Sequence, residues 1–153
     1  MQNSNYRKFF AMLATSLVSM YLVMFLNVAS IDHIYLSLTR FYMALLMVSP
    51  MALTMLLFMP MMYPDTKKNI LIGLTSVLMF VLALILLRYQ VPIGDRQYME
   101  AMIPHHSSAI MTSSSADIKD PQVRELADSI ISSQKREIQL MKAILNRLEN
   151  KQP

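Results

Sequence analysis

Three long apolar runs without a charged side chain lie in the first 90 residues and strongly limit what this chain can fold into. The runs cover residues 9–29, 41–63 and 70–87. A helix that rises about 1.5 Å per residue needs about 20 apolar residues to cross the hydrocarbon core of a bilayer. We therefore expect an all-α fold that begins with a membrane domain, residues 1–90, of three transmembrane helices.

The charges between the runs predict an orientation in the membrane. One predicted side of the membrane has four basic residues: Arg7, Lys8, Lys67 and Lys68. The other side has three basic residues, Arg40, Arg88 and Arg96, together with Asp32 and His33. The positive-inside rule then places the amino terminus in the cytoplasm, and three spans place the carboxyl-terminal segment outside. We expect a bacterial-type inner (plasma) membrane with that segment in the periplasm or an equivalent compartment.

The first run has a second interpretation, as a cleaved signal peptide. Arg7 and Lys8 precede the run, and small residues follow it at Val28-Ala29-Ser30. Its apolar stretch exceeds the 7 to 15 residues usual in signal peptides, which favours a span. Either interpretation leaves the carboxyl-terminal segment outside the cytoplasm.

Methionines recur at every fourth residue of the second run, at Met43, Met47, Met51, Met55 and Met59. This spacing stacks them along one side of a helix. A thioether ladder suits a soft monovalent metal such as Cu(I), whereas flexible apolar methionines also simply pack and face lipid. A conducting ladder requires sulfurs that face the protein interior.

Residues 91–153 have a different composition, with eight basic and eight acidic residues. Apolar residues at helical spacing predict two helices, at about 95–112 and 121–150. Asp120 suits the N-cap of the second helix and Pro121 its first position. The second helix has an apolar face from Val123 to Leu148, interrupted by Gln134 and Glu137, and its basic residues Lys135, Arg136, Lys142 and Arg147 are expected in solvent.

A hairpin of about 60 residues buries little apolar surface and is marginally stable alone. We therefore expect a homodimer in which two hairpins form a four-helix bundle. Without cysteine, the chain has neither thiolate metal sites nor thiolate nucleophiles. It shows no motif of a hydrolase, phosphate-binding loop or di-iron centre, and no basic face for nucleic acid, so we expect no enzyme and no nucleic-acid partner.

Histidine and methionine gather in the first helix of the hairpin. Met99, Met102 and His106 lie within one arc of the predicted helix. His105 points about 100° away from His106, although Pro104 removes a backbone donor and favours a local kink. The residues alone leave two interpretations open: a metal site, or a histidine pair that fixes helix packing through Glu137, Gln134 or a backbone carbonyl.

The hairpin resembles the Domain of Unknown Function 305 family. The resemblance rests on Met102-Ile103-Pro104-His105-His106 with Ala109-Ile110-Met111, then Asp120-Pro121-x-Val123-Arg124-x-Leu126-Ala127, and finally Gln134-x-x-Glu137-Ile138-x-x-Met141. It covers about residues 95–149. Members of that family are ferritin-like, helical and usually exported, and some bind copper.

The resemblance implies copper ligands at matching positions: His105, His106, Met102, Met111 and Met141. It adds Glu137 and Gln134 as ligands or supporting partners, and Met99 joins the set through its place beside Met102. Two departures bear on this transfer. The chain carries the Met-x-x-His-His unit once where many members carry it twice, and Ser107 and Ser108 replace the residues that usually follow the histidines.

The sequence thus predicts a membrane-anchored protein that binds Cu(I) or Ag(I) through histidine and methionine. It would buffer copper, support copper tolerance or pass the metal to a copper transporter or chaperone. Imidazole accepts both copper oxidation states, and thioethers favour Cu(I). The alternative is a membrane scaffold without metal, in which the hairpin is a dimerisation or docking module.

Overall fold

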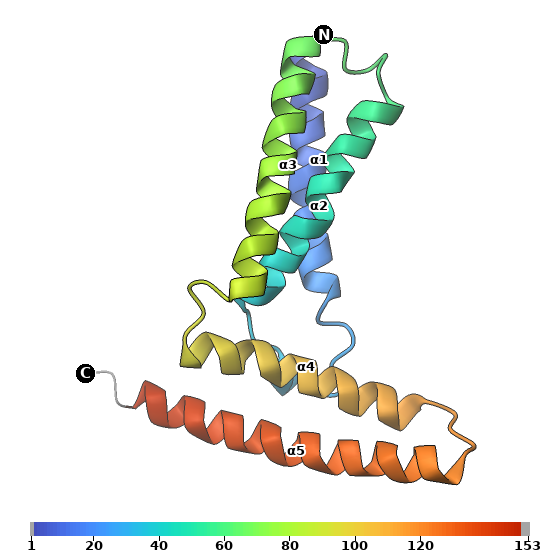
Figure 1. Cartoon of the computed structure of the whole chain (residues 1–153), viewed down its shortest axis with the longest axis vertical. Coiled ribbons are helices and arrows are strands. Elements are labelled where there is room, and N and C mark those ends of the chain that lie inside the picture. The colour runs from blue at the N-terminus through green and yellow to red at the C-terminus, as the bar shows by residue number, and fades with distance from the viewer. Residues whose placement is uncertain (1, 151–153) are drawn as a thin grey trace. The chain divides into compact units, whose positions relative to one another are not determined.

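A computed structural model of the chain describes residues 2–150, with side chains from residue 4. The described residues form α-helices and one short 3₁₀ helix, with no strand, so the predicted all-α class is confirmed. Figure 1 labels the helices α1 (Gln2–Val23), α2 (Leu38–Phe58), α3 (Thr66–Tyr89), α4 (Asp95–Ser115) and α5 (Pro121–Glu149), and η1 is Ile31–His33.

The chain divides into two compact units. Unit 1 runs from the amino terminus to Met24 and over Thr39–Pro92, and it contains α1, α2 and α3. Unit 2 contains α4 and α5 together with Phe25–Leu38, a segment that lies between α1 and α2 in the sequence. The sequence predicts this segment as part of the membrane domain, residues 1–90, whereas the structure packs it with the hairpin.

Two helices of unit 1, α2 and α3, are long and apolar enough to cross a membrane. They correspond to the second and third apolar runs. Among the residues described, α1 does not pass the same test, and the expectation of three spans is corrected to two apolar helices. The reason is where α1 ends. Its apolar part, residues 9–23, gives about 22 Å of helix, short of the roughly 30 Å hydrocarbon core.

Aromatic residues make the core of unit 1 at one end of its helices. Tyr6, Phe9 and Tyr63 are buried with Ala52 and Ile72. The Phe9 and Tyr63 rings meet edge to face with their centroids 5.2 Å apart, an arrangement that aromatic quadrupoles favour. The beginning of α1 is thereby fixed against the connection between α2 and α3.

The methionine ladder of α2 does not line a continuous interior path. Met43, Met47 and Met59 are exposed, while Met55 packs against the aromatic core. Conduction through the ladder required interior sulfurs, and the exposed residues do not provide them. Pro50 lies inside α2 without ending the helix.

Unit 2 is built on the hairpin of α4 and α5. Asp120 caps α5 by accepting hydrogen bonds from the backbone N–H groups of Gln122 (2.9 Å) and Val123 (3.0 Å), and Pro121 takes the first helical position, so both predictions are confirmed. The core between the helices contains Met99, Ile103, Ile110, Ile138 and Leu145. α4 continues through Pro104 as one helix.

Ion pairs and hydrogen bonds align the two helices. Arg96 near the start of α4 pairs with Glu149 near the end of α5, with Nη2 and Oε1 3.0 Å apart. At the other end of the hairpin, Arg124 donates to the Ser113 carbonyl at 3.2 Å. Together with the apolar core, these contacts set the register in which residues of α4 face residues of α5.

Candidate functional site

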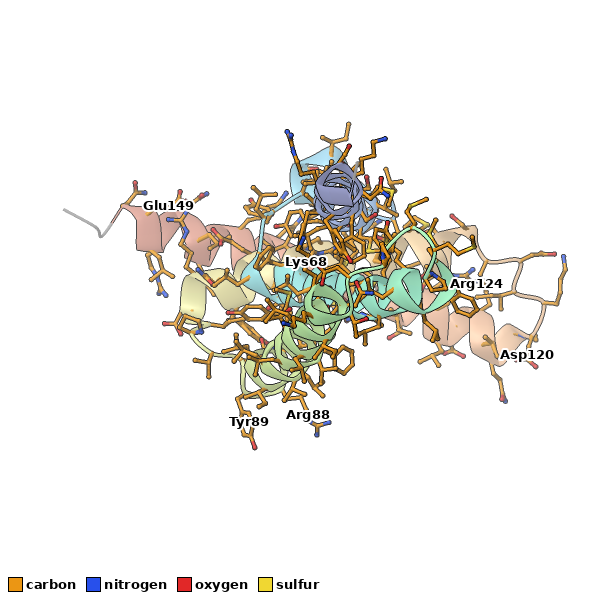
Figure 2. The ribbon with its side chains drawn as sticks, turned by 90° about the horizontal axis from the view of Figure 1, so that it is seen from above. Lys68, Arg88, Tyr89, Asp120, Arg124 and Glu149 are labelled. Atoms are coloured by element: carbon orange, nitrogen blue, oxygen red, sulfur yellow. The ribbon has the colours of Figure 1, made fainter. Side chains whose placement is uncertain are left out.

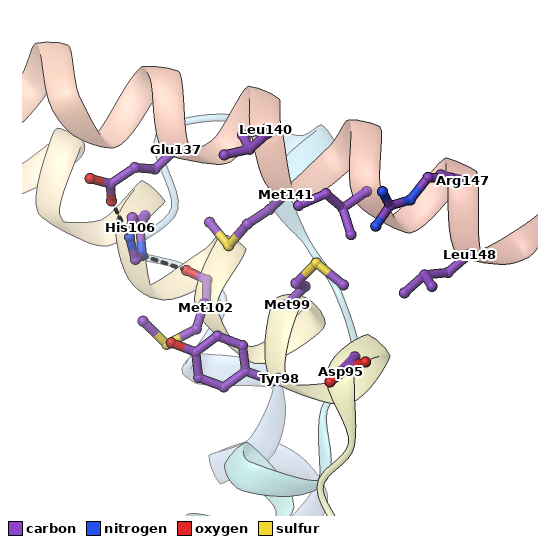
Figure 3. Close-up of a pocket in the computed structure, with 11 residues that line it drawn as sticks. Asp95, Tyr98, Met99, Met102, His106, Glu137, Leu140, Met141, Arg147 and Leu148 are labelled. Atoms are coloured by element: carbon purple, nitrogen blue, oxygen red, sulfur yellow. Dashed lines mark hydrogen bonds and ion pairs between the residues drawn. The ribbon is translucent and has the colours of Figure 1, made fainter.

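A cavity of about 420 Å³ lies between α4 and α5 (Figure 3). Its walls come from two helical stripes, spaced three or four residues apart as one face of a helix requires. The lining residues are Asp95, Tyr98, Met99, Met102 and His106 from α4, and Glu137, Leu140, Met141, Ile144, Arg147 and Leu148 from α5. Five of the sequence-predicted site residues, Met99, Met102, His106, Glu137 and Met141, therefore line one cavity.

His106 lies between two hydrogen-bond acceptors. Its Nδ1 is 2.9 Å from the Met102 carbonyl oxygen, one helical turn earlier, and its Nε2 is 2.7 Å from Glu137 Oε2 on α5. Figure 3 shows both contacts as dashed lines. The side chain of His106 is 12% exposed and that of Glu137 is 50% exposed, so the pair lies at the mouth of the cavity.

These contacts fix the orientation of the His106 ring. A backbone carbonyl only accepts, so the Nδ1–H group donates to the Met102 carbonyl oxygen, and Nε2 faces the Glu137 carboxylate. The hydrogen bond at Nδ1 leaves Nε2 as the ring nitrogen that points toward the cavity mouth. Metal-ligating histidines commonly have such support.

Three methionine side chains contribute thioether sulfurs to the lining of the cavity. Met99 is buried, and Met102 and Met141 are partly buried. Met141 packs against the cluster that contains Met99, so sulfur-bearing side chains from both helices meet in the hairpin core. Thioethers bring soft, neutral donors that need no deprotonation.

The other predicted ligands lie elsewhere. His105 is exposed and its ring centroid is 6.0 Å from that of His106, as neighbouring positions on a helix require. Met111 and Gln134 are partly buried and do not line the cavity. The Oε1 atom of Gln134 is buried without a hydrogen-bond partner in the structure. The roles predicted for these three residues stay predictions.

Several cavity residues of this unit are not singled out by the sequence patterns. Tyr98, Leu140 and Arg147 line the cavity, and Arg147 is exposed, as the sequence predicts. Tyr98 lies four residues before Met102, and Leu140 three residues after Glu137, so extending the helical stripes would have identified both. Lys142 had also been expected in solvent, but it donates to the Asp32 carboxylate. No periodic pattern connects those two residues across the sequence.

Ser107, next to His106, anchors the segment Phe25–Leu38 to α4. Its hydroxyl is fully buried, accepts the Ala29 backbone N–H at 2.8 Å and lies 2.8 Å from His33 Nδ1. Ser108 accepts a hydrogen bond from Asn27 Nδ2 at 2.8 Å. The two serines that depart from the family pattern therefore hold this segment, and the full burial of Ser107 leaves its hydroxyl no access to a substrate.

Electrostatics around His33 favour its neutral ring. Burial lowers the pKa of His33 and the Lys142 ammonium lowers it further, while Asp32 acts in the opposite direction. Hydrogen bonds, from Lys142 first and then Ser30, lower the pKa of Asp32 well below its usual range. With its ring neutral, His33 can accept a hydrogen bond from the Ser107 hydroxyl at Nδ1, and its Nε2 lies 3.8 Å from Asp32 Oδ2.

The described residues also limit what kind of metal site unit 2 offers. Among them, no group of three His, Cys, Asp or Glu side chains is placed to hold a metal ion. Hard divalent cations need several oxygen ligands, and structural zinc needs four nitrogen, sulfur or carboxylate ligands. A metal ion in this cavity would therefore need the thioethers as ligands.

Residues 84–147, which include the end of α3 and most of the hairpin, match the profile of a described family, the domain of unknown function DUF305. The chain belongs to this family. A relative from Acanthamoeba polyphaga mimivirus, described as an uncharacterized protein, is 41% identical over 145 residues, which cover 92% of this chain and 93% of the relative. The similarity thus includes unit 1 as well as the hairpin. No solved structure matches the chain.

Proposed function

We propose that this chain is a membrane-anchored protein that binds Cu(I) or Ag(I) in the cavity between α4 and α5, and that it buffers copper or supports copper tolerance. One observation carries the proposal. Met99, Met102, His106 and Met141 line the same cavity, although they come from two helices. Soft thioethers with one imidazole make a donor set that suits soft monovalent ions better than hard divalent ones.

The charges at the cavity mouth also favour a monovalent ion. The charged groups of the lining are the carboxylates of Asp95 and Glu137 and the guanidinium of Arg147, two negative charges and one positive. A monovalent cation balances the one negative charge in excess. A divalent ion would leave one positive charge uncompensated beside Arg147. Glu137 thus serves either as a ligand or as a charge partner of the bound ion.

The membrane anchor is the second part of the proposal. Only 28% of the most apolar stretch of α2 and 17% of that of α3 is buried within the chain. Core helices of soluble proteins hide most of their apolar surface, and contiguous exposed apolar surface marks an interaction with lipid or protein. We propose that α2 and α3 span the bilayer and that α1 packs with them as a short third helix.

The finer topology remains the prediction made from the sequence: amino terminus in the cytoplasm and hairpin outside. The bacterial-type inner membrane is also a sequence prediction, and the mimivirus relative brings no support for it. A cysteine-free, thioether-based site suits an oxidising compartment, because thioether ligands require no reduced thiol.

We further propose that two hairpins pair as a homodimer. Val123 and Leu126 on α5 are 50% and 60% exposed, so apolar surface of α5 is left uncovered by its own chain. The chain has no cysteine, and Leu126→Cys therefore introduces a single thiol. Disulfide-linked dimers of this variant in membranes support pairing through this part of α5. A strict monomer under oxidising conditions counts against it.

The exposed apolar surface of α5 at Val123 and Leu126 also favours a second candidate function, a membrane scaffold that acts without metal. The scaffold hypothesis predicts that dimerisation persists while no Cu(I) binds. A copper buffer predicts stoichiometric Cu(I) binding, with a copper transporter or chaperone as the recipient.

The test is a Cu(I) titration of the full chain in detergent against a chromophoric competitor. His106→Ala removes the imidazole, and the proposal predicts at least about a tenfold loss of affinity, as expected when a close partner of the ion is lost. His105→Ala is the matched control, since it deletes the neighbouring exposed imidazole. Equal losses for both variants would reject this assignment of the site.

A further inference from the structure

A second cavity lies in unit 1, at the end where α1 and α3 begin. Its volume is about 440 Å³. The lining combines two cationic side chains, Arg7 and Lys68, with the apolar side chains Phe10, Leu71 and Ile72 and the ring of Tyr6. Nothing in the proposed copper chemistry uses this cavity.

Hydrogen bonds of Tyr6 build this end of the unit. The Tyr6 hydroxyl donates to Asn69 Oδ1 at 2.8 Å and accepts the Asp65 backbone N–H at 3.2 Å. Asn69 in turn donates through Nδ2 to the Tyr63 carbonyl at 2.7 Å. The start of α1 is thus joined to the start of α3, and the cavity walls come from two fixed helices.

The two cations differ in their surroundings. The Lys68 ammonium lies 5.1 Å from the centre of the Tyr6 ring and 3.3 Å from the Asp65 carboxylate, which compensates part of its charge. Arg7 is exposed, and no carboxylate of the described residues forms an ion pair with it. The cavity rim therefore has a net positive charge, with a guanidinium available for bidentate contact with an oxyanion.

Phe10 and Leu71 form an apolar wall of the cavity, which a soluble anion such as free phosphate would not contact favourably. Both are large and exposed, at 55% and 63%, and they line the cavity beside the cations. An anion with an attached hydrocarbon chain fits both halves of the lining. Basic pockets beside membrane helices are established sites for anionic lipid head groups.

We propose that this cavity binds an anionic phospholipid, with the phosphate between Arg7 and Lys68 and an acyl chain along Phe10 and Leu71. On the predicted topology, this end of unit 1 faces the cytoplasmic leaflet. The inference rests on the proposed membrane anchor but not on copper, so reconstitution into bilayers tests the anchor separately from lipid selectivity.

The experiment is native mass spectrometry of the full chain in detergent, titrated with phosphatidylglycerol or with phosphatidylcholine of the same acyl chains. The proposal predicts tighter binding of phosphatidylglycerol. Arg7→Gln/Lys68→Gln weakens this binding by about tenfold or more, because a charge-assisted contact is lost at each end of the phosphate.

Lys8→Gln/Lys67→Gln is the matched control. It removes the same charge from positions next to Arg7 and Lys68 on the same two helices, but neither Lys8 nor Lys67 lines the cavity. Exposed charges contribute little individually, so a loss below about threefold is expected. Equal losses in the two double variants would show general charge attraction and overturn the site.

Two further arms separate a lipid from a free anion and from misfolding. Inorganic phosphate, added up to millimolar concentration, is expected not to displace phosphatidylglycerol, and displacement would overturn the lipid assignment. Circular dichroism of both double variants is expected to match that of the parent chain. If Arg7→Gln/Lys68→Gln loses helix, the single variant Arg7→Gln replaces it, since Arg7 is exposed and outside the Tyr6 hydrogen bonds.

Discussion

Replacing Ser107 with alanine tests how the segment Phe25–Leu38 is held on α4. The hydroxyl is fully buried, accepts the Ala29 N–H at 2.8 Å and contacts His33 Nδ1 at 2.8 Å. Ser107→Ala removes one oxygen and leaves two polar groups without their partner. Both hydrogen bonds are part-buried, and each contributes about 0.5–1.5 kcal/mol, so the docked segment is expected to lose about 1–3 kcal/mol.

Hydrogen exchange of the Ala29 amide measures this loss directly. Opening of a segment that is 2 kcal/mol less stable is about 30-fold more frequent, and the amide exchanges correspondingly faster. Ser108→Ala is the control, because its hydrogen bond to Asn27 is exposed and its loss costs little. Unchanged exchange at Ala29 in Ser107→Ala would refute the claim that this hydroxyl anchors the segment.

Three further predictions follow from unit 2. The pKa of His33 is lower in the folded chain than its unfolded value of about 6.5, so the unfolded state binds more protons. Docking of Phe25–Leu38 on α4 is therefore most stable above pH 6.5 and weakens as the pH falls below it, which is measured as faster exchange of the Ala29 amide. Ile103→Ala, at a fully buried core position, lowers the free energy of unfolding of the hairpin by about 2–5 kcal/mol in denaturant titrations. Asp120→Ala removes the α5 cap and costs about 1 kcal/mol, measured in the same titrations, while Asp117→Ala in the adjacent connection costs less.

Helix signals in the sequence are local and transfer well to the structure. The pair Asp120-Pro121 predicts the start of α5, because the cap and the first helical position need only neighbouring residues. The arc of Met99, Met102 and His106 likewise predicts one wall of the cavity from helical spacing. The opposite wall, Glu137 and Met141, came from the family resemblance, since periodicity alone does not set the register between two helices.

Long-range polar contacts were not predictable from the same patterns. Ala29 and Ser107 are 78 residues apart, and Asp32 and Lys142 are 110 residues apart. Neither pair belongs to a repeat or motif, so the docking of Phe25–Leu38 on the hairpin became visible only in the structure. The prediction of a first transmembrane span was wrong for a related reason. The apolar run continues to residue 29, whereas α1 ends at Val23 and the residues from Phe25 onward belong to unit 2.

Ion pairs at the hairpin surface lie near both ends of α5. Figure 2 shows Arg124 and Glu149 toward opposite ends of this helix. Both form ion pairs, Arg124 with Asp128 at 2.7 Å and Glu149 with Arg96 at 3.0 Å. Exposed pairs of this kind add little stability, so the hairpin depends on its apolar core and on what covers Val123 and Leu126.

X-ray absorption spectroscopy of the Cu(I)-loaded full chain tests the central proposal most directly, because it identifies the atoms bound to the metal. The account predicts sulfur and nitrogen in the first coordination shell, with thioethers from Met99, Met102 and Met141 and the imidazole of His106 as their sources. Replacing the three methionines with leucine is expected to remove the sulfur signal while the hairpin keeps its helix content. A shell of nitrogen and oxygen alone, unchanged in the leucine variant, would contradict the proposed site.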